Sequence, residues 1–371
     1  LIRADSRGMM TLVSAISLAT PSPLRIDGLV AAVFTPFTHD GSLDLTVVPQ
    51  QSRYLADTGV HWAFVGGTTG ESLSLSVAER MGLLEAWRKT NTSVIAHCGA
   101  EALGDAKQLA RHAAANGAAA IAAMPPTFFK PATAEALALT IAAICTAAPE
   151  LPCYYYHIPS MTGVATTFPV LDFVKAVEPL APNFCGVKYT GMYTYPGMMD
   201  AMKILDYKDG KFEVLSGREE MMLEVNACAP SDRDTWKCPL LIDGKPVPQA
   251  LSIGIKGHVG SQFNFAGDLF NMIRIDFEKL GLTTQTEARL RKLQLIAVQL
   301  IDAWKDSSPA GVNGAKFFTN LAGIPVNDAR LPSIPVSRTA SKALRDALHN
   351  FCDSLVHVVM PSLKICDMVP Q

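Results

Sequence analysis

One lysine lies in the middle of a short apolar stretch of this chain. The stretch, Asn183-Phe-Cys-Gly-Val-Lys-Tyr-Thr-Gly191, has the pattern of a strand with Lys188 at its centre. An amine in such a run is costly to desolvate, so it either reaches out to water or has a lowered pKa. The first case is an ordinary edge-strand lysine, whereas the second is an amine able to attack a ketone and form a Schiff base.

The glycine-rich segment Gly67-Thr68-Thr69-Gly70 follows another apolar stretch. Its two hydroxyls and its free backbone N–H groups suit a small carboxylate or a phosphate. An ordinary glycine-rich turn has the same composition, so both interpretations stay open for this segment taken alone.

Three consecutive tyrosines end a third apolar stretch. Alternation along a strand places Tyr154 and Tyr156 on one face and Tyr155 on the other. A phenol that faces the centre of a barrel can relay protons, whereas aromatic packing in the core is the alternative for each tyrosine. By the same alternation, Thr190 shares the face of Lys188.

Two more polar clusters follow apolar stretches further along the chain. One is Gly217-Arg218-Glu219-Glu220, and the other contains Ser261. Paired acids at the start of a helix also interact favourably with the helix dipole, so capping is the alternative role for the two glutamates.

The elements that carry these clusters alternate between short strands and helices. Strands are predicted at 29–37, 62–65, 93–98, 119–124, 153–158, 184–189, 212–215 and 255–261. Helices are predicted between them, including one at 77–90 that Ser76 and Glu79 open with a capping-box pattern. Eight such units predict an α/β fold, a closed (β/α)8 TIM barrel with a C-terminal helical appendage. A doubly wound open sheet is the alternative, but no GxGxxG follows the first strand.

In such a barrel the functional groups lie at the C-terminal ends of the strands. All five clusters fall there, and their shared location favours a reactive Lys188. The predicted organisation is an N-terminal tail at 1–24, the barrel at 25–270, C-terminal helices at 271–355 and a tail at 356–371. We interpret the helices as serving packing and subunit contacts.

A long segment near 229–252 precedes the last predicted strand. Asp243-Gly244 within it predicts a hairpin turn. Because the segment joins a helix to the following strand, it is expected at the face opposite the active site, without contact to substrate.

Composition narrows the class of protein. The 371 residues carry a formal net charge of −2 without a dense basic run, which argues against nucleic acid as a partner. No apolar run has membrane-spanning length. Eight scattered cysteines without a CxxC pair predict reduced thiols rather than a disulfide frame or a metal site, and a cytoplasmic location.

Four motifs together resemble those of one enzyme superfamily. They are Gly67-Thr-Thr-Gly-Glu71, Tyr155-Tyr-His-Ile-Pro159 with Thr162-Gly163, Gly186-Val-Lys-Tyr-Thr190 and Gly260-Ser-Gln-Phe-Asn264. In this order and spacing they resemble the class I pyruvate aldolases of the dihydrodipicolinate synthase and N-acetylneuraminate lyase superfamily. The resemblance covers roughly Leu24 to Phe351.

The resemblance implies a role for each matching position. Lys188 would form the Schiff base with pyruvate C2, and Tyr156 would donate and accept the proton during C–C cleavage. Thr68 and Thr69 would hold the pyruvate carboxylate. The sugar chain would be bound by Thr190, Gly217, Glu219, Glu220 and Ser261. The resemblance implies no metal and no organic cofactor, and a homotetramer acting on a small molecule.

Met161 separates two branches of the superfamily. Dihydrodipicolinate synthases usually carry an arginine there for a second carboxylate, with which a thioether cannot pair. His157 and the acids Glu219 and Glu220 resemble the lyase branch, which cleaves sialic acid reversibly to pyruvate and N-acetyl-D-mannosamine. A related aldolase for a 2-keto-3-deoxy sugar acid is the enzymatic alternative, and a non-catalytic ligand-binding barrel is the alternative of another class.

Two positions depart from the family pattern. Glu219 stands where the lyases commonly have aspartate, which could alter the sugar preference. Phe128-Phe129 stands where many relatives place a tyrosine of the proton relay, so a relay through a neighbouring subunit is in doubt.

Overall fold

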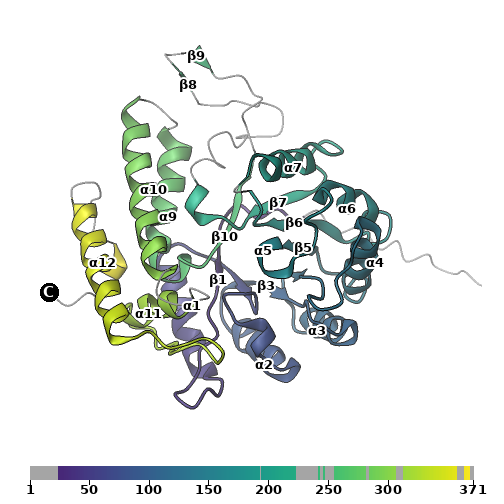
Figure 1. The fold of residues 1–371 in the computed structure, drawn as a ribbon, viewed down its shortest axis with the longest axis horizontal. Helices are drawn as coiled ribbons and strands as arrows, with labels where there is room; N and C mark the ends of the chain where they lie inside the picture. Colours follow the sequence, from purple (N-terminus) through teal and green to yellow (C-terminus); the bar gives the residue numbers. More distant parts are fainter. Residues whose placement is uncertain are drawn as a thin grey trace, which may run out of the picture.

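The computed structural model describes residues 24–192, 194–222, 241–242, 245–246, 255–280, 284–305, 312–356 and 363–367. Within these residues, eight parallel strands close into a barrel in the order β1-β10-β7-β6-β5-β4-β3-β2 (Figure 1). The strands are β1 Gly28–Ala32, β2 Trp62–Val65, β3 Ser93–His97, β4 Ala120–Ala123, β5 Cys153–His157, β6 Phe184–Tyr189, β7 Glu213–Ser216 and β10 Gly257–Gly260. The predicted (β/α)8 barrel is confirmed.

Helices surround the outside of the barrel (Figure 1). They are α1 Val48–Asp57, α2 Val77–Arg88, α3 Leu103–Ala115, α4 Ala134–Cys145, α6 Val170–Val177, α7 Tyr195–Asp206 and α9 Phe263–Leu280. The predicted capping box at the start of α2 is present, since Ser76 Oγ accepts from Glu79 N and Glu79 accepts from Ser76 N. A four-residue helix after β5, α5 Pro159–Thr162, was not predicted.

The first strand is shorter than predicted and ends at Ala32. Beyond it, Thr35 Oγ1 donates to the carbonyl of Gly70 at 2.7 Å. Pro36 has no N–H with which to continue the ladder. The segment after β1 thus contacts the glycine-rich loop, and Phe34 within it lines the cavity described below.

Two buried apolar layers hold the barrel together. One fills its interior and includes Val30, Phe64, Tyr154, Tyr156 and Leu215, and the other lies between the strands and the surrounding helices. Because successive side chains of a strand point to opposite faces, a strand such as β2 contributes to both layers, with Phe64 inside and Ala63 and Val65 outside. The packed interior leaves polar groups to emerge at the strand ends.

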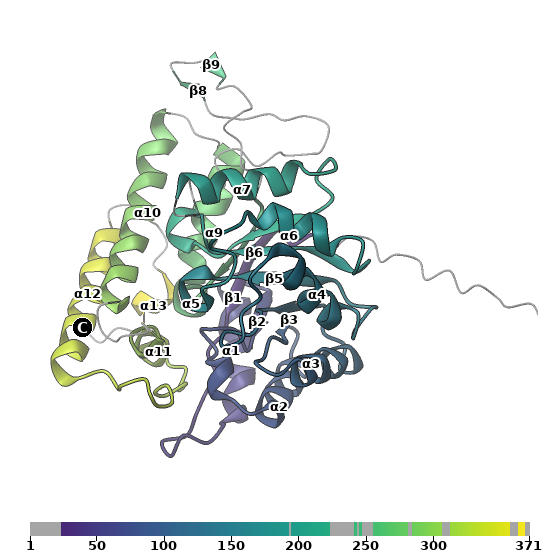
Figure 2. The same ribbon diagram turned by 45° about the vertical axis from the view of Figure 1, so that its right-hand side comes forward.

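Further helices follow the barrel and stand along one side of it (Figures 1 and 2). They are α10 Thr284–Lys305, α11 Val312–Leu321, α12 Arg338–Val356 and α13 Lys364–Asp367. The predicted C-terminal appendage is thus present. Part of the expected 356–371 tail is folded, because Lys364–Asp367 is helical with Ile365 buried and Cys366 bonded to Cys352.

The prediction of reduced thiols is wrong for four cysteines. Disulfides join Cys145 to Cys153 and Cys352 to Cys366. The first pair links the end of α4 to the start of β5, two elements that any αβ unit brings together. The two cysteines are 8 residues apart, and this spacing does not by itself indicate a disulfide. Whether the two sulfurs meet depends on how the connection between α4 and β5 folds back. The cytoplasmic location, which rested partly on free thiols, stays a prediction.

Two expectations fall mostly outside the described residues. Of the N-terminal tail predicted at 1–24, residues 1–23 lie outside them. Of the segment near 229–252, the described parts are β8 Leu241–Ile242 and β9 Lys245–Pro246, which pair antiparallel as the hairpin prediction requires. The placement of this segment relative to the active site stays a prediction.

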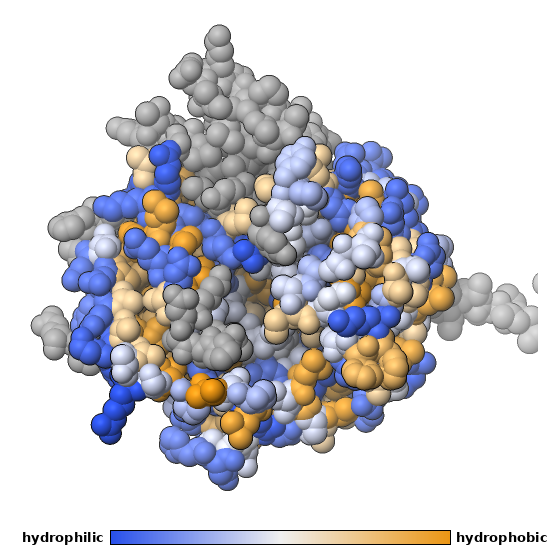
Figure 3. Space-filling model, viewed as in Figure 1, coloured by the Kyte–Doolittle hydropathy of each residue, from blue (hydrophilic) through white to orange (hydrophobic). Residues whose placement is uncertain are grey.

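The described helices include none long and apolar enough to cross a bilayer. The space-filling view in Figure 3 shows hydrophilic residues interspersed with apolar ones over this face.

Candidate active site

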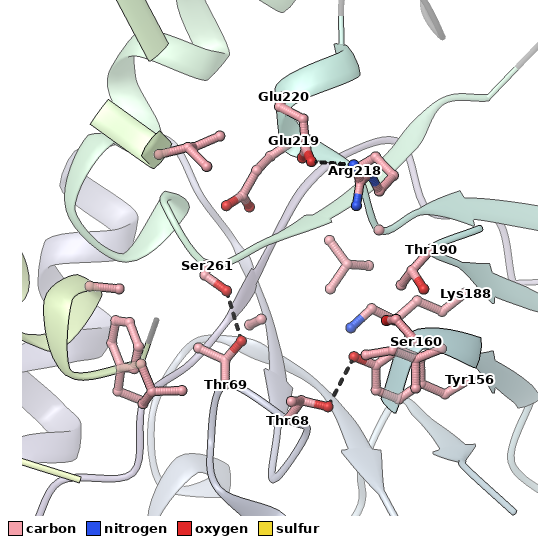
Figure 4. A pocket seen from close by; sticks show the side chains of 18 of the residues that line it. Thr68, Thr69, Tyr156, Ser160, Lys188, Thr190, Arg218, Glu219, Glu220 and Ser261 are labelled. Carbon is pink, nitrogen blue, oxygen red and sulfur yellow. Dashed lines mark hydrogen bonds and ion pairs between the residues drawn. The ribbon is translucent and has the colours of Figure 1, made fainter. Parts of the chain in front are cut away.

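A cavity of about 220 Å³ opens at the C-terminal ends of the barrel strands (Figure 4). All nine residues singled out in the sequence line it, namely Lys188, Tyr156, Thr68, Thr69, Thr190, Gly217, Glu219, Glu220 and Ser261. They come from the ends of five different strands and the loops that follow them. The barrel alone brings these distant segments together, as its topology requires.

Lys188 is buried and extends toward this cavity from β6. Its Nζ lies 3.8 Å from the ring centroid of Tyr156 and 4.2 Å from that of Phe64. Burial lowers the pKa of Lys188 to about 7, although the negative charge of Glu219 opposes the shift. A large fraction of the amine is therefore neutral near pH 7, and a neutral amine is the nucleophile that imine formation needs.

Tyr156 is the neighbour of Lys188 on the adjacent strand, and their Cα atoms are partners in the β5–β6 register. Its hydroxyl lies 3.3 Å from Thr68 Oγ1. Burial raises the pKa of Tyr156 to about 12, against the lowering effect of the Thr68 hydrogen bond. The phenol thus stays protonated at neutral pH and can pass protons along the hydroxyl pair that Figure 4 shows.

The loop after β2 presents a second hydroxyl pair to the cavity. Thr69 Oγ1 and Ser261 Oγ lie 2.7 Å apart, which links the ends of β2 and β10 (Figure 4). With Thr68, they form a row of hydroxyl groups along the side of the cavity next to Lys188. Such uncharged donors suit a carboxylate group of a small substrate.

Two acids lie at the opposite side of the cavity, in the 3-10 helix Glu219–Met221 that follows β7. Glu219 is buried, and its Oε1 accepts from Gln262 N at 3.2 Å. A Cβ at Gly260 would lie 1.8 Å from Glu219 Oε2, so this position has no room for a side chain. Carboxylate oxygens facing a cavity accept hydrogen bonds from hydroxyl groups.

The charge of Glu220 is shared with an arginine. Its Oε1 lies 2.6 Å from Arg218 Nη2. Arg218 also lines the cavity, yet the sequence interpretation did not select it. The ion pair leaves this guanidinium less available to an acidic group of a substrate.

Thr190 and Gly217 lie between the lysine and the acids. Thr190 Oγ1 donates to the carbonyl of His157 at 2.9 Å. A Cβ at Gly217 would lie 2.6 Å from Thr190 Cγ2, so glycine makes room for the threonine. Gly217 thus allows its backbone and the Thr190 side chain to lie close together, and the Gly217 backbone lines the cavity.

The cavity also has walls that sequence reasoning missed. Ile301 and Trp304 of α10, and Val312 and Ala315 of α11, line it together with Ser160 of α5. The C-terminal helices therefore form part of the site, beyond the packing and subunit contacts expected of them. A hydrophobic wall has no polar sequence signal, so helical periodicity could not separate it from core.

Of the two departures from the family pattern, Glu219 lines the cavity, whereas Phe128-Phe129 lies away from it. Phe128 and Phe129 are 81% and 84% exposed, and their rings meet edge to face at 5.0 Å. Met161 is exposed as well, at 62%. None of these three side chains lines the described cavity.

Among the described residues, no group of three or more His, Cys, Asp or Glu side chains is arranged to hold a metal ion. What the cavity offers instead is an amine, a phenol, hydroxyls and carboxylates. This set supports covalent catalysis on a carbonyl compound with proton transfer.

Comparisons with known proteins agree with this chemistry. Residues 25–228 match the model of the dihydrodipicolinate synthetase family. N-acetylneuraminate lyase of Danio rerio is 33% identical over 337 residues, which are 89% of this chain and 98% of the relative. The same-named protein of Gallus gallus is 34% identical over 84% of this chain and 92% of its own length. Among solved structures, Proteus mirabilis N-acetylneuraminate lyase superposes with a TM-score of 0.74 at 27% identity, covering 89% of this chain and 99% of that one.

The match to the family spans more than half of the chain, and the Danio rerio relative is aligned over nearly its whole length. Lys188, Tyr156, Thr68 and Thr69 lie within the residues that the family model matches. The chain belongs to the dihydrodipicolinate synthetase family.

Proposed function

We propose that this protein is a class I aldolase that cleaves N-acetylneuraminate reversibly to pyruvate and N-acetyl-D-mannosamine. The observation that carries the proposal is the buried Lys188 amine, with its pKa lowered to about 7, against the ring of Tyr156. A lysine kept so far from water is expensive for a fold and is useful where a neutral amine must attack a ketone. The similarity to N-acetylneuraminate lyases supports the identity of the substrate.

The reaction begins at the ketone of the open-chain sugar acid. Lys188 Nζ attacks C2, and loss of water leaves a protonated imine between the nitrogen and C2. Thr68 and Thr69 hold the neighbouring carboxylate with their hydroxyls and loop N–H groups. The imine is the electron sink for the next step.

Tyr156 acts on the hydroxyl at C4 of the imine. As the phenol takes the C4 hydroxyl proton, it passes its own proton toward Thr68 and on to water or substrate groups. The C3–C4 bond breaks, C4 becomes the aldehyde of N-acetyl-D-mannosamine, and the electron pair moves into the imine to give an enamine. Protonation at C3 and hydrolysis then release pyruvate and restore the amine.

The far side of the cavity favours a sugar over an acidic substrate. Glu219 and Glu220 present carboxylates that accept hydrogen bonds from hydroxyl groups, and Thr190 and Ser261 add hydroxyls. The guanidinium of Arg218 is already paired with Glu220. A second carboxylate on the substrate would meet two like charges there, which disfavours it.

The purified protein should release pyruvate from N-acetylneuraminate with a kcat/KM about tenfold or more above that for 2-keto-3-deoxygluconate, because the acids match the longer polyhydroxy chain. Lactate dehydrogenase coupled to NADH oxidation measures the released pyruvate for both substrates. A higher kcat/KM for the gluconate derivative would establish the rival aldolase. Pyruvate release from neither substrate would favour a ligand-binding barrel.

The rate should depend on the protonation of Lys188. Only the neutral amine attacks, so kcat/KM should be constant above the pKa of about 7 and fall about tenfold per pH unit below it. Glu219→Gln removes the charge that raises this pKa, so the acid limb should move to lower pH. A pH series from 5 to about 9 for both proteins measures the limb. An unmoved limb would mean that Glu219 does not act on the amine.

We propose further that the protein assembles as a homotetramer and works in the cytoplasm. The exposed Phe128 and Phe129 rings form an apolar surface of the kind that subunit contacts cover. Sedimentation velocity measures the assembly directly.

A further inference from the structure

Lys316 of α11 is a charged group that the proposed reaction does not use. Its side chain is 0% exposed, and its Nζ lies 2.8 Å from Glu71 Oε1. The ammonium group also donates to the carbonyl of Asp328 at 3.3 Å and lies 4.4 Å from the ring centroid of Phe37. Burial of an ammonium is unfavourable unless a counter-charge accompanies it, so Glu71 and Lys316 depend on each other.

Glu71 ends the loop whose threonines line the active-site cavity. Its backbone is left-handed, with φ of 58°, a conformation that a residue with a side chain adopts only when its surroundings impose it. Glu71 N donates to the carbonyl of Thr68 at 3.0 Å. The position of Glu71 is therefore transmitted to Thr68 through one hydrogen bond across a tight turn.

The second carboxylate oxygen of Glu71 is held from the same C-terminal region. Glu71 Oε2 accepts from Arg330 N at 2.8 Å. The Arg330 guanidinium is itself bonded to Glu79 of α2 and, at 2.8 Å, to the carbonyl of Gly41. One oxygen of Glu71 thus contacts α11 through Lys316, and the other contacts the segment between α11 and α12 through Arg330. Glu79 and the carbonyl of Gly41 hold the Arg330 side chain in return.

Helix α11 reaches the cavity and the loop with consecutive residues. Ala315 lines the cavity, whereas Lys316 reaches Glu71 behind the loop. Movement of α11 would change the cavity wall and withdraw the counter-charge of Glu71 together. The loop would then lose the contacts that hold its left-handed residue.

We propose that Lys316 and Glu71 are positioning residues through which α11 holds the Gly67–Glu71 loop in the geometry that binds the pyruvate carboxylate. The inference rests on the proposed function, since it takes the ligand of the loop to be that carboxylate. The C-terminal helices would then both form a wall of the cavity and raise the affinity for pyruvate. Packing of α11 against the loop would then favour pyruvate binding, and bound pyruvate would in turn favour the packing of α11.

The test compares Glu71→Gln, Lys316→Met and the double variant with the wild-type protein. The double variant leaves no buried charge without a partner, so it is the one expected to fold with the network broken. Borohydride trapping at increasing pyruvate gives the concentration for half-maximal adduct on Lys188, and condensation kinetics give KM for pyruvate and for N-acetyl-D-mannosamine. We expect the double variant to raise both pyruvate constants about tenfold and to leave KM for the sugar within about twofold.

Thr319→Val is the matched control, because Thr319 is buried in the same helix and its hydroxyl bonds the carbonyl of Ala315, away from Glu71. It should leave the pyruvate constants unchanged, while thermal unfolding followed by circular dichroism shows how far each variant is destabilised. A folded double variant with wild-type pyruvate constants, or an equal rise of KM for both substrates, would overturn the proposal.

Hydrogen exchange on the wild-type protein tests the coupling without any variant. Trapped pyruvate should slow amide exchange in α11 and leave α12 unchanged; unchanged exchange in α11 would also overturn the proposal. A wild-type protein that traps pyruvate without cleaving N-acetylneuraminate refutes the proposed substrate but leaves the titration valid. A wild-type protein that traps no pyruvate refutes the proposed function, and the inference falls with it.

Discussion

Lys188→Ala should abolish the borohydride-trapped pyruvate adduct and lower kcat for N-acetylneuraminate cleavage by roughly 10⁴-fold or more, as loss of a covalent nucleophile does. The physical reason is that, among the described residues that line the cavity, Lys188 alone supplies an amine. Burial lowers the pKa of this amine to about 7. Mass spectrometry of the reduced protein locates the adduct, and the coupled pyruvate assay measures the rate.

A lysine elsewhere provides the control for this substitution. Lys208 is exposed, and its Nζ lies 2.7 Å from Glu178 at the surface. Lys208→Ala should keep both adduct and turnover, whereas Lys188→Ala should lose both with its circular dichroism spectrum unchanged. Turnover retained by a folded Lys188→Ala protein would exclude the Schiff-base mechanism.

Tyr156→Phe should lower kcat by about 10²- to 10⁴-fold, the usual contribution of a positioned acid–base group. The ring beside Lys188 and its packing on Phe64 remain, so the amine should still form an imine with pyruvate. We therefore expect pyruvate trapping to persist while C–C cleavage fails. Parallel trapping and steady-state assays separate the two steps.

The neighbouring tyrosine makes a matched comparison. Tyr155 is equally buried on the same strand but faces outward, where it packs on Phe173. Tyr155→Phe should change kcat little, since its hydroxyl contacts His157 rather than the cavity. Equal losses in Tyr155→Phe and Tyr156→Phe would indicate a packing effect and remove the proton-transfer role of Tyr156.

The wall that the C-terminal helices add to the cavity bears on both of these predictions. Trp304 and Ala315 place apolar groups beside the polar ones, and a drier cavity strengthens electrostatic interactions within it. The pKa of Lys188 is lowered mainly by burial of its amine. The appendage supplies an apolar wall to the cavity in which the barrel residues carry out the proposed chemistry.

Much of the site could be predicted from local pattern because a barrel has few ways to arrange its strands. Alternation puts Lys188 and Thr190 on one face of β6 and Tyr156 on the same side of β5. Once eight strands close in order, their C-terminal ends must meet at one mouth. The apolar periodicity of the chain was therefore sufficient to place the five clusters at one mouth, whereas the selection of the nine residues within them came from the family resemblance.

Contacts between segments far apart in the chain could not be obtained this way. Arg330 N and Glu71 are separated by 259 residues, and the disulfide between Cys352 and Cys366 depends on α13 folding back. Such contacts follow from the angles at which helices pack, and helical periodicity specifies which face is buried but not against what. Local sequence thus defined the barrel and its reactive groups, whereas packing of the last helices determined one wall of the cavity and the buried ion pair of Glu71 and Lys316.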